Sequence, residues 1–252
     1  MPDAVPTITD PRWGQADRDT KAEAILRTIE LMTPERDVRR VTWLDIGCGS
    51  GGIAATLAQH VDSVIGVDPE SWQRWEQFRT VHYNLKLHQG SYRDLDTLCG
   101  SNSIDVAVCN QVYEHVDDPV ALLAAIHRVL KPGGLCYFAG PNLLWPIEPH
   151  VFWPFVHWLP RRFAQRLMRT LGSRRAAELD AYSTHYWRLL HLFRDTGLFY
   201  ENAIPARILA SQPKACMPRI LSSVAAARPV LWGLTPLAPG FVFLLHKAEQ
   251  CK

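Results

Sequence analysis

Short apolar runs alternate with helix-like stretches through the first half of the chain. The apolar runs have the length of buried strands and span 41–46, 64–68, 84–88, 104–109 and 135–139. The stretches between them predict helices, as in 19–31, where Ala22, Ile25 and Ile29 share one face. Further helices are predicted over 51–59, 71–78 and 119–130. Strands that alternate with helices form βαβ units, so we expect an α/β fold with a doubly wound, mostly parallel sheet.

The pattern changes after Gly140. Residues 141–181 are rich in tryptophan, proline and arginine, and we expect them to form a helical lid insertion. The alternation then resumes with predicted helices over 186–196 and within 218–232, and predicted strands over 199–209 and 241–245. The prediction is a single domain over 1–252 that contains the lid insertion.

Composition narrows the class of protein only slightly. The 252 residues are 47% hydrophobic, which suffices for one sizeable core, and the net charge of +2 favours no class of partner. The 6 cysteines form no C-x-x-C pair, which favours a reducing compartment. Residues 1–6 lack the pattern of a signal peptide, and proline and glycine interrupt the apolar stretch 230–245. We therefore expect a cytoplasmic protein.

A glycine-rich turn follows the first predicted strand. Gly47, Gly49 and Gly52 have the spacing of a dinucleotide-binding turn, in which glycine lets a ligand approach the backbone closely. Asp68 ends the next strand, at about the distance along the chain where such sites place a ribose-binding carboxylate. The alternative for both features is a purely structural turn.

The chain resembles the class I S-adenosylmethionine-dependent methyltransferases at four motifs. Residues 44–51 (LDIGCGSG) resemble the first motif of that family, and 65–69 (IGVDP) resemble the second. Residues 105–110 and 114–119 together resemble the fourth motif of the family, and residues 130–134 (LKPGG) resemble the turn before the fifth strand. This resemblance covers about 41–140 and implies a Rossmann-like fold with a seven-stranded sheet. A nicotinamide enzyme is not expected to carry the last two motifs.

The resemblance also implies which residues bind the cofactor S-adenosylmethionine. The first motif would surround the methionine part, Asp68 would bind ribose, and 90–92 would contact adenine, although many members have aspartate where Ser91 stands. Asn110 and Gln111 would border the methyl donor. The implied cofactor-binding residues are Asp45, Gly47, Cys48, Gly49, Gly51, Asp68, Pro69, Ser91, Tyr92, Asn110 and Gln111.

Methyl transfer is an in-line displacement that depends mainly on positioning, and a base is needed only when the acceptor must lose a proton. We expect His150, held in a proline-flanked segment, or His185 to act as base or substrate contact. Other side chains that could serve are Glu148, His157 and Tyr182. Glu114 and His115 are expected to pair at a helix start. In some relatives such a pair binds a metal ion with a preceding glutamate; here Gln111 replaces it, so we expect no metal.

Two surfaces are expected on the insertion. Trp153, Phe155, Trp158 and Leu159 either line an apolar acceptor pocket or attach the insertion to the domain. Between 161 and 171, apolar residues share one helical face and arginines share another. A basic face beside an apolar one fits a membrane surface or a phosphate-bearing acceptor, and a solvated helix face is the alternative. No nucleic-acid partner is expected, because no RNA-binding module flanks the domain.

These features predict a methyltransferase that acts on oxygen, nitrogen or carbon of a small or lipid-linked acceptor. Two other functions stay open from the sequence. One is a nicotinamide-dependent oxidoreductase, and the other is a non-catalytic, cofactor-binding partner subunit.

Overall fold

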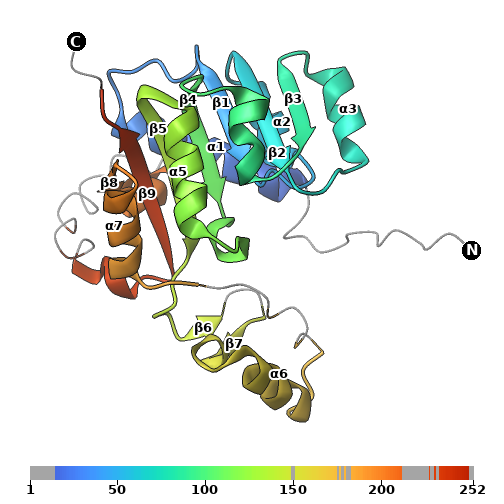
Figure 1. Ribbon diagram of the computed structural model, residues 1–252, viewed down its shortest axis with the longest axis vertical. Helices are drawn as coiled ribbons and strands as arrows, with labels where there is room; N and C mark the ends of the chain where they lie inside the picture. The colour runs from blue at the N-terminus through green and yellow to red at the C-terminus, as the bar shows by residue number, and fades with distance from the viewer. Residues whose placement is uncertain are drawn as a thin grey trace, which may run out of the picture.

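The fold is built around a seven-stranded sheet (Figure 1). The computed structural model describes residues 15–148, 151–174, 183–211 and 233–249, together with 176, 179, 227 and 230. The strand order is β3-β2-β1-β4-β5-β9-β8, in which β9 runs antiparallel to β5 and β8 and the other neighbours are parallel. The strands are β1 (Thr42–Ile46), β2 (Ser63–Asp68), β3 (Leu85–Gln89), β4 (Ile104–Asn110), β5 (Leu130–Pro141), β8 (Leu198–Asn202) and β9 (Gly240–Lys247). The predicted α/β, mostly parallel fold is confirmed.

Helices cover both faces of this sheet. One face carries α1 (Gln15–Met32), α2 (Gly52–Ala58), α3 (Arg74–Val81) and α8 (Ile204–Ala210). The other face carries α4 (Leu95–Cys99), α5 (Pro119–Val129) and α7 (Tyr186–Asp195). Such two-sided cover makes the sheet doubly wound.

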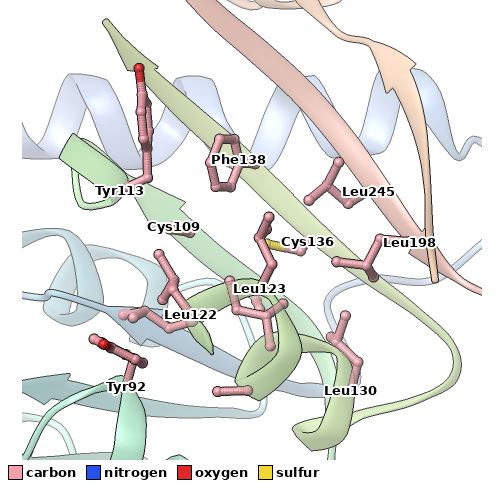
Figure 2. Close-up of a cluster of buried hydrophobic side chains, with 14 of the residues drawn as sticks. Tyr92, Cys109, Tyr113, Leu122, Leu123, Leu130, Cys136, Phe138, Leu198 and Leu245 are labelled. Carbon is pink, nitrogen blue, oxygen red and sulfur yellow. The ribbon is translucent and has the colours of Figure 1, made fainter. Parts of the chain in front are cut away.

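Side chains of the central strands alternate between two cores. Leu44, Ala107 and Phe138 pack on the side of α5 and α7, where Figure 2 shows Phe138 among the other buried side chains. Their neighbours Trp43 and Val108 pack on the side of α1 and α2. Because both faces of each central strand are buried, these strands are continuous apolar runs in the sequence.

Two predicted elements differ from the structure. The predicted strand over 199–209 is wrong, because β8 ends at Asn202 and α8 follows. The Asn202 Oδ1 accepts the Ile204 backbone N–H at 3.0 Å, and Pro205 lies in the first turn of α8, where proline is favoured. Helix α3 begins three residues later than predicted, and α4 was not predicted. The helix expected within 218–232 lies outside the described residues except at 227 and 230.

The insertion is only partly helical. A two-stranded hairpin pairs β6 (Ile147–Glu148) with β7 (Trp153–Pro154), a 3₁₀ turn spans Val156–Trp158, and α6 (Arg161–Thr170) follows. Prolines at 146, 149, 154 and 160 interrupt any helix before α6, which accounts for the difference. Buried side chains give the insertion a small core of its own: Val151, Val156, Ala164, Met168, Ala176 and Leu179.

The insertion projects beyond the carboxyl end of β5 (Figure 1). The parallel strands β1, β2 and β4 end at the same edge of the sheet. Within the described part of the chain, every helix is too short or too polar to cross a lipid bilayer.

Candidate functional site

The turn between β1 and α2 is held in place by the neighbouring strand and helix. The backbone N–H groups of Gly47 and Cys48 donate to the Val67 carbonyl at 2.8 and 3.1 Å. The Gly49 N–H donates to Asp68 Oδ2 at 2.8 Å, and the Gly49 carbonyl accepts from Trp75 Nε1 at 2.9 Å. The turn therefore has a fixed shape at the carboxyl edge of the sheet. Sequence analysis did not identify Trp75, whose buried ring belongs to α3.

The glycines of the turn have different steric surroundings. Gly47, Gly49 and Gly51 all have positive φ, at 68°, 51° and 83°, which other residues rarely adopt. A Cβ at Gly47 would lie 2.7 Å from Val112, and one at Gly51 would lie 3.3 Å from Leu87. A Cβ at Gly49 would have no atom within 4 Å. Gly49 therefore borders open space, whereas packing explains the other two glycines.

Asp68 links this turn to the segment after β2. Besides the Gly49 N–H, its carboxylate accepts the Glu70 N–H at 3.0 Å and Trp72 Nε1 at 3.4 Å, both on Oδ1. Pro69 follows directly and lines the cavity described below. The carboxylate is half-buried, so part of its hydrogen-bonding capacity faces outward.

Asp45 is a buried carboxyl group directly below the turn. It is 3% exposed, and its Oδ2 has no hydrogen-bond partner among the described residues; the same is true of the Ser50 hydroxyl. Burial raises the pKa of Asp45 to about 7, and the Arg18 charge opposes that rise. A buried oxygen without a partner costs free energy, which a cationic ligand group would recover. This environment fits the ammonium group of a bound amino acid moiety.

Arg18 is a site residue that sequence analysis missed. It lies on the stripe of α1 that includes Ala22, Ile25 and Ile29, and that stripe faces the core. Its side chain crosses Gly52, where a Cβ would lie 2.3 Å from the Arg18 Cδ. Burial lowers the pKa of Arg18, and Asp45 opposes this effect. An arginine on a core-facing stripe was the available signal in the sequence.

A cavity of about 370 Å³ opens beside the turn. It lies at the carboxyl ends of β1, β2, β3 and β4, where open α/β sheets bind ligands. The residues that line it are Ile46, Gly47, Val67, Pro69, Gly90, Ser91, Tyr92, Arg93, Val112, His115, Val116 and Asp117. Four predicted cofactor residues are in this set: Gly47, Pro69, Ser91 and Tyr92. Asp45, Cys48, Gly49, Gly51, Asp68, Asn110 and Gln111 lie outside this lining.

One wall of the cavity is a network around Asp117. The Tyr92 hydroxyl donates to Asp117 Oδ1 at 2.7 Å, and Arg93 forms an ion pair with Asp117 Oδ2 at 2.8 Å. The hydrogen bonds from Arg93 and Tyr92 lower the pKa of Asp117 to about 2. Ser91 caps the 3₁₀ turn Tyr92–Asp94, since its hydroxyl donates to Asp94 and accepts the Arg93 N–H. Sequence analysis did not identify Arg93 or Asp117.

The chain turns sharply where β4 ends. Asn110 is half-buried and the following Gln111 is exposed, with a φ of 59° in the left-handed region. The Gln111 N–H donates to the Ala139 carbonyl at 2.8 Å, which fixes this conformation. Such backbone outliers concentrate at ligand sites. The turn directs the chain to Val112 and His115 in the cavity wall.

The histidine candidates occupy different places. His150 and Tyr182 lie outside the described residues. His185 begins α7, and its Nδ1 accepts the Arg188 N–H at 3.2 Å, which occupies the nitrogen that a base would use in this tautomer. His115 is exposed and lines the cavity, whereas the adjacent Glu114 is fully buried.

The remaining candidates have structural contacts within the insertion. Glu148 Oε2 accepts the Val151 N–H at 2.7 Å in the hairpin. His157 Nε2 lies 2.8 Å from the Trp145 carbonyl and 3.1 Å from the Leu143 carbonyl. No group of three potential metal-ligating side chains occurs among the residues that the structure describes.

Residues 44–138 match the family model described as "Methyltransferase domain". Over these residues the chain carries a methyltransferase domain. A ubiquinone biosynthesis O-methyltransferase of Pseudomonas paraeruginosa is 32% identical to this domain over 108 residues, which are 40% of this chain and 44% of the relative. The match thus covers less than half of the length of that curated relative.

Solved structures share the fold of the methyltransferase domain. The plantazolicin methyltransferase BamL, in complex with a triazolic desmethylPZN analog and SAH, superposes with a TM-score of 0.57 at 14% identity, covering 92% of this chain and 85% of that one. An S-adenosylmethionine-dependent methyltransferase from Mesorhizobium loti gives 0.55 at 18% identity, with coverages of 90% and 100%. The match to a methyltransferase family model does not favour the oxidoreductase and partner-subunit alternatives.

Proposed function

We propose that this chain transfers a methyl group from S-adenosylmethionine to oxygen, nitrogen or carbon of a small or lipid-linked acceptor, in the cytoplasm. The observation that carries the proposal is the buried carboxyl group of Asp45, whose Oδ2 has no partner among the described residues, below a glycine turn that borders open space. The similarity to an O-methyltransferase of Pseudomonas paraeruginosa supports oxygen as the first atom to test.

The cofactor-binding residues fall into three groups in this proposal. Asp45, Gly47, Cys48, Gly49 and Gly51 form the methionine subsite, with Arg18 placed to meet the carboxylate of the same moiety. Asp68 and Pro69 form the ribose subsite, because the Asp68 carboxylate is anchored by Gly49 and half-exposed. Ser91 and Tyr92 border the adenine subsite. The Ser91 hydroxyl is engaged with Asp94, so the exocyclic amine would donate to Asp117, which lines the cavity and whose oxygens each bind one group and can accept a second hydrogen bond.

The residues of this chain would promote the reaction mainly by orienting the methyl donor and the acceptor. When bound, S-adenosylmethionine would supply a sulfonium methyl group, whose carbon an acceptor nucleophile would attack in line with the S–C bond, with S-adenosylhomocysteine as the leaving group. Asn110 and Gln111 at the end of β4 would border the reacting atoms, and the bond of Gln111 to Ala139 would hold them there. Holding two reactants in line contributes roughly 7–11 kcal/mol to such reactions.

An acceptor that must lose a proton needs a base near this site. His115 is favoured over His185, because His115 lines the cavity and the His185 Nδ1 is engaged by Arg188. His150 remains a candidate from its sequence position. We infer that the insertion borders the acceptor, since it follows β5 at the edge of the sheet where the cavity opens.

Ligand binding and turnover test this function separately. We expect the purified chain to bind S-adenosylhomocysteine in isothermal titration and not NADH, and to label a small-molecule extract from a radioactive methyl donor. Asp45→Asn should weaken S-adenosylhomocysteine binding, while Asp62→Asn, at an exposed position far from the turn, should not. Binding of NADH alone would overturn the proposal, and cofactor binding without any turnover would favour the partner-subunit alternative.

A further inference from the structure

Residues 152–171 of the insertion expose six large apolar side chains. We call this set the insertion surface: Phe152, Phe155, Trp158, Phe163, Leu167 and Leu171, which are 57, 50, 50, 60, 38 and 63% exposed. On α6, Ala164 and Met168 are fully buried in the core of the insertion, whereas Phe163, Leu167 and Leu171 form a separate ridge with the spacing of one helical turn. The insertion surface is therefore not part of that core.

Backbone strain accompanies two of these aromatic residues. Phe152 and Phe155 have φ values of 57° and 61°, in the left-handed region that is unfavourable for bulky residues. Backbone hydrogen bonds to Glu148 and Pro146 fix these turns, with the Phe152 and Phe155 N–H groups as donors. Strain that presents aromatic side chains at a surface points to a function for that surface.

The described segment 151–174 carries arginines and no acidic residue. No acidic residue occurs from 149 to 177, a segment that contains six arginines. Arg162, Arg166 and Arg169 are exposed on α6, on the side of the exposed ridge away from Ala164 and Met168. No acidic side chain in the described segments pairs with any of these three.

We propose that the insertion surface docks on an anionic lipid bilayer, with its aromatic and aliphatic side chains in the interface and the α6 arginines against lipid phosphates. An apolar ridge bordered by arginine is the pattern of helices that lie in the plane of a membrane interface. A second copy of the chain fits less well, because two surfaces of the same charge would face each other. A soluble phosphate would leave the apolar ridge in water. The docking does not depend on methyl transfer and would hold for a soluble acceptor.

Vesicle sedimentation tests the proposal with the full chain. We expect binding to vesicles of phosphatidylcholine with 25% phosphatidylglycerol, no binding to pure phosphatidylcholine vesicles, and weaker binding as salt rises. Replacing Arg162, Arg166 and Arg169 by Gln should reduce binding about fivefold per residue, or on the order of a hundredfold together. Phe163→Ser with Leu167→Ser should reduce binding about tenfold, since both residues are exposed in the free protein.

Matched controls remove similar groups elsewhere. Arg40, Arg188 and Arg194 are exposed outside the insertion and give the charge control when replaced by Gln. Phe199→Ser with Leu237→Ser gives the apolar control, at 65 and 59% exposure. Unchanged circular dichroism and S-adenosylhomocysteine affinity would show that the variants fold.

Three results would overturn the docking proposal. The first is equal binding to both vesicle compositions or to neither. The second is an equal effect of the insertion variants and their controls. The third is a dimer in sedimentation velocity that Phe163→Ser dissociates while vesicles remain unbound, which would assign the insertion surface to self-association.

Discussion

The buried Asp45 predicts that cofactor affinity depends on pH. In the free protein, burial raises the pKa of this carboxyl from 3.8 to about 7. A cationic ligand group at its unpartnered oxygen stabilises the ionised form, so the pKa falls on binding. Below pH 7 the ligand must therefore displace a proton. With a pKa of about 7, the ionised fraction changes about 25-fold between pH 5.5 and 7.5, and the affinity should rise by that factor.

Calorimetry with S-adenosylhomocysteine measures both parts of this prediction. Titrations at pH 5.5–8 in two buffers of different ionisation enthalpy should show release of about one proton per ligand below pH 7. Asp45→Asn has the same shape but cannot ionise, so the proton release should vanish and the affinity at pH 7.5 should fall about 10- to 100-fold. Arg18→Gln removes the charge that lowers the Asp45 pKa, so the midpoint should move to higher pH.

Protein stability provides an independent check on the same group. Because the folded-state pKa of Asp45 lies above its unfolded-state value, the native protein binds more protons between pH 4 and 7. The free energy of unfolding of the wild type, relative to Asp45→Asn, should therefore fall as pH rises through this window. An S-adenosylhomocysteine affinity that is flat from pH 5.5 to 7.5, with the same proton count in wild type and Asp45→Asn, would refute the reasoning.

Three further predictions concern the turn, the ribose subsite and metal. Asp68→Ala should weaken S-adenosylhomocysteine binding about tenfold or more and lower the melting temperature, because the Gly49 and Glu70 N–H groups lose their acceptor; unchanged affinity in a folded variant would contradict it. Gly49→Val should lose S-adenosylhomocysteine binding in calorimetry, because a β-branched residue at a φ of 51° strains the turn and its side chain would occupy the open space beside it; normal binding by a folded variant would make the turn structural only. Chelation by EDTA should leave turnover unchanged, because Gln111 is a poor metal ligand, and loss of activity that magnesium restores would show this to be wrong.

The sheet could be predicted because its strands are buried on both faces. Continuous apolar runs such as those of β1 and β4 allow few other structures. The segment after Leu198 gave a weaker signal, because β8 lies at the edge of the sheet and apolar residues resume at Ala203 and Ile204, directly where α8 begins. Pro205, in the first turn of α8, is the local signal that a helix begins there.

The cofactor site was only partly predictable, because its residues come from distant segments. The glycine turn and Asp68 belong to local motifs that have a recognisable spacing. Arg18 reaches the turn from α1, and Asp117 joins the Tyr92 side of the cavity from beyond β4. No spacing rule connects such residues, since only the tertiary fold brings them together.

The separate core of the insertion has a consequence for how this protein can diversify. Residues 151–179 bury their apolar side chains against one another, while the sheet packs its own two cores. A mutation in the insertion core therefore acts first on packing within the insertion and leaves the packing of the two sheet cores unchanged. Recombination at the ends of this segment would exchange one insertion for another without repacking the sheet. Under the proposals above, the acceptor and the docking partner could therefore change in evolution while the cofactor site is retained.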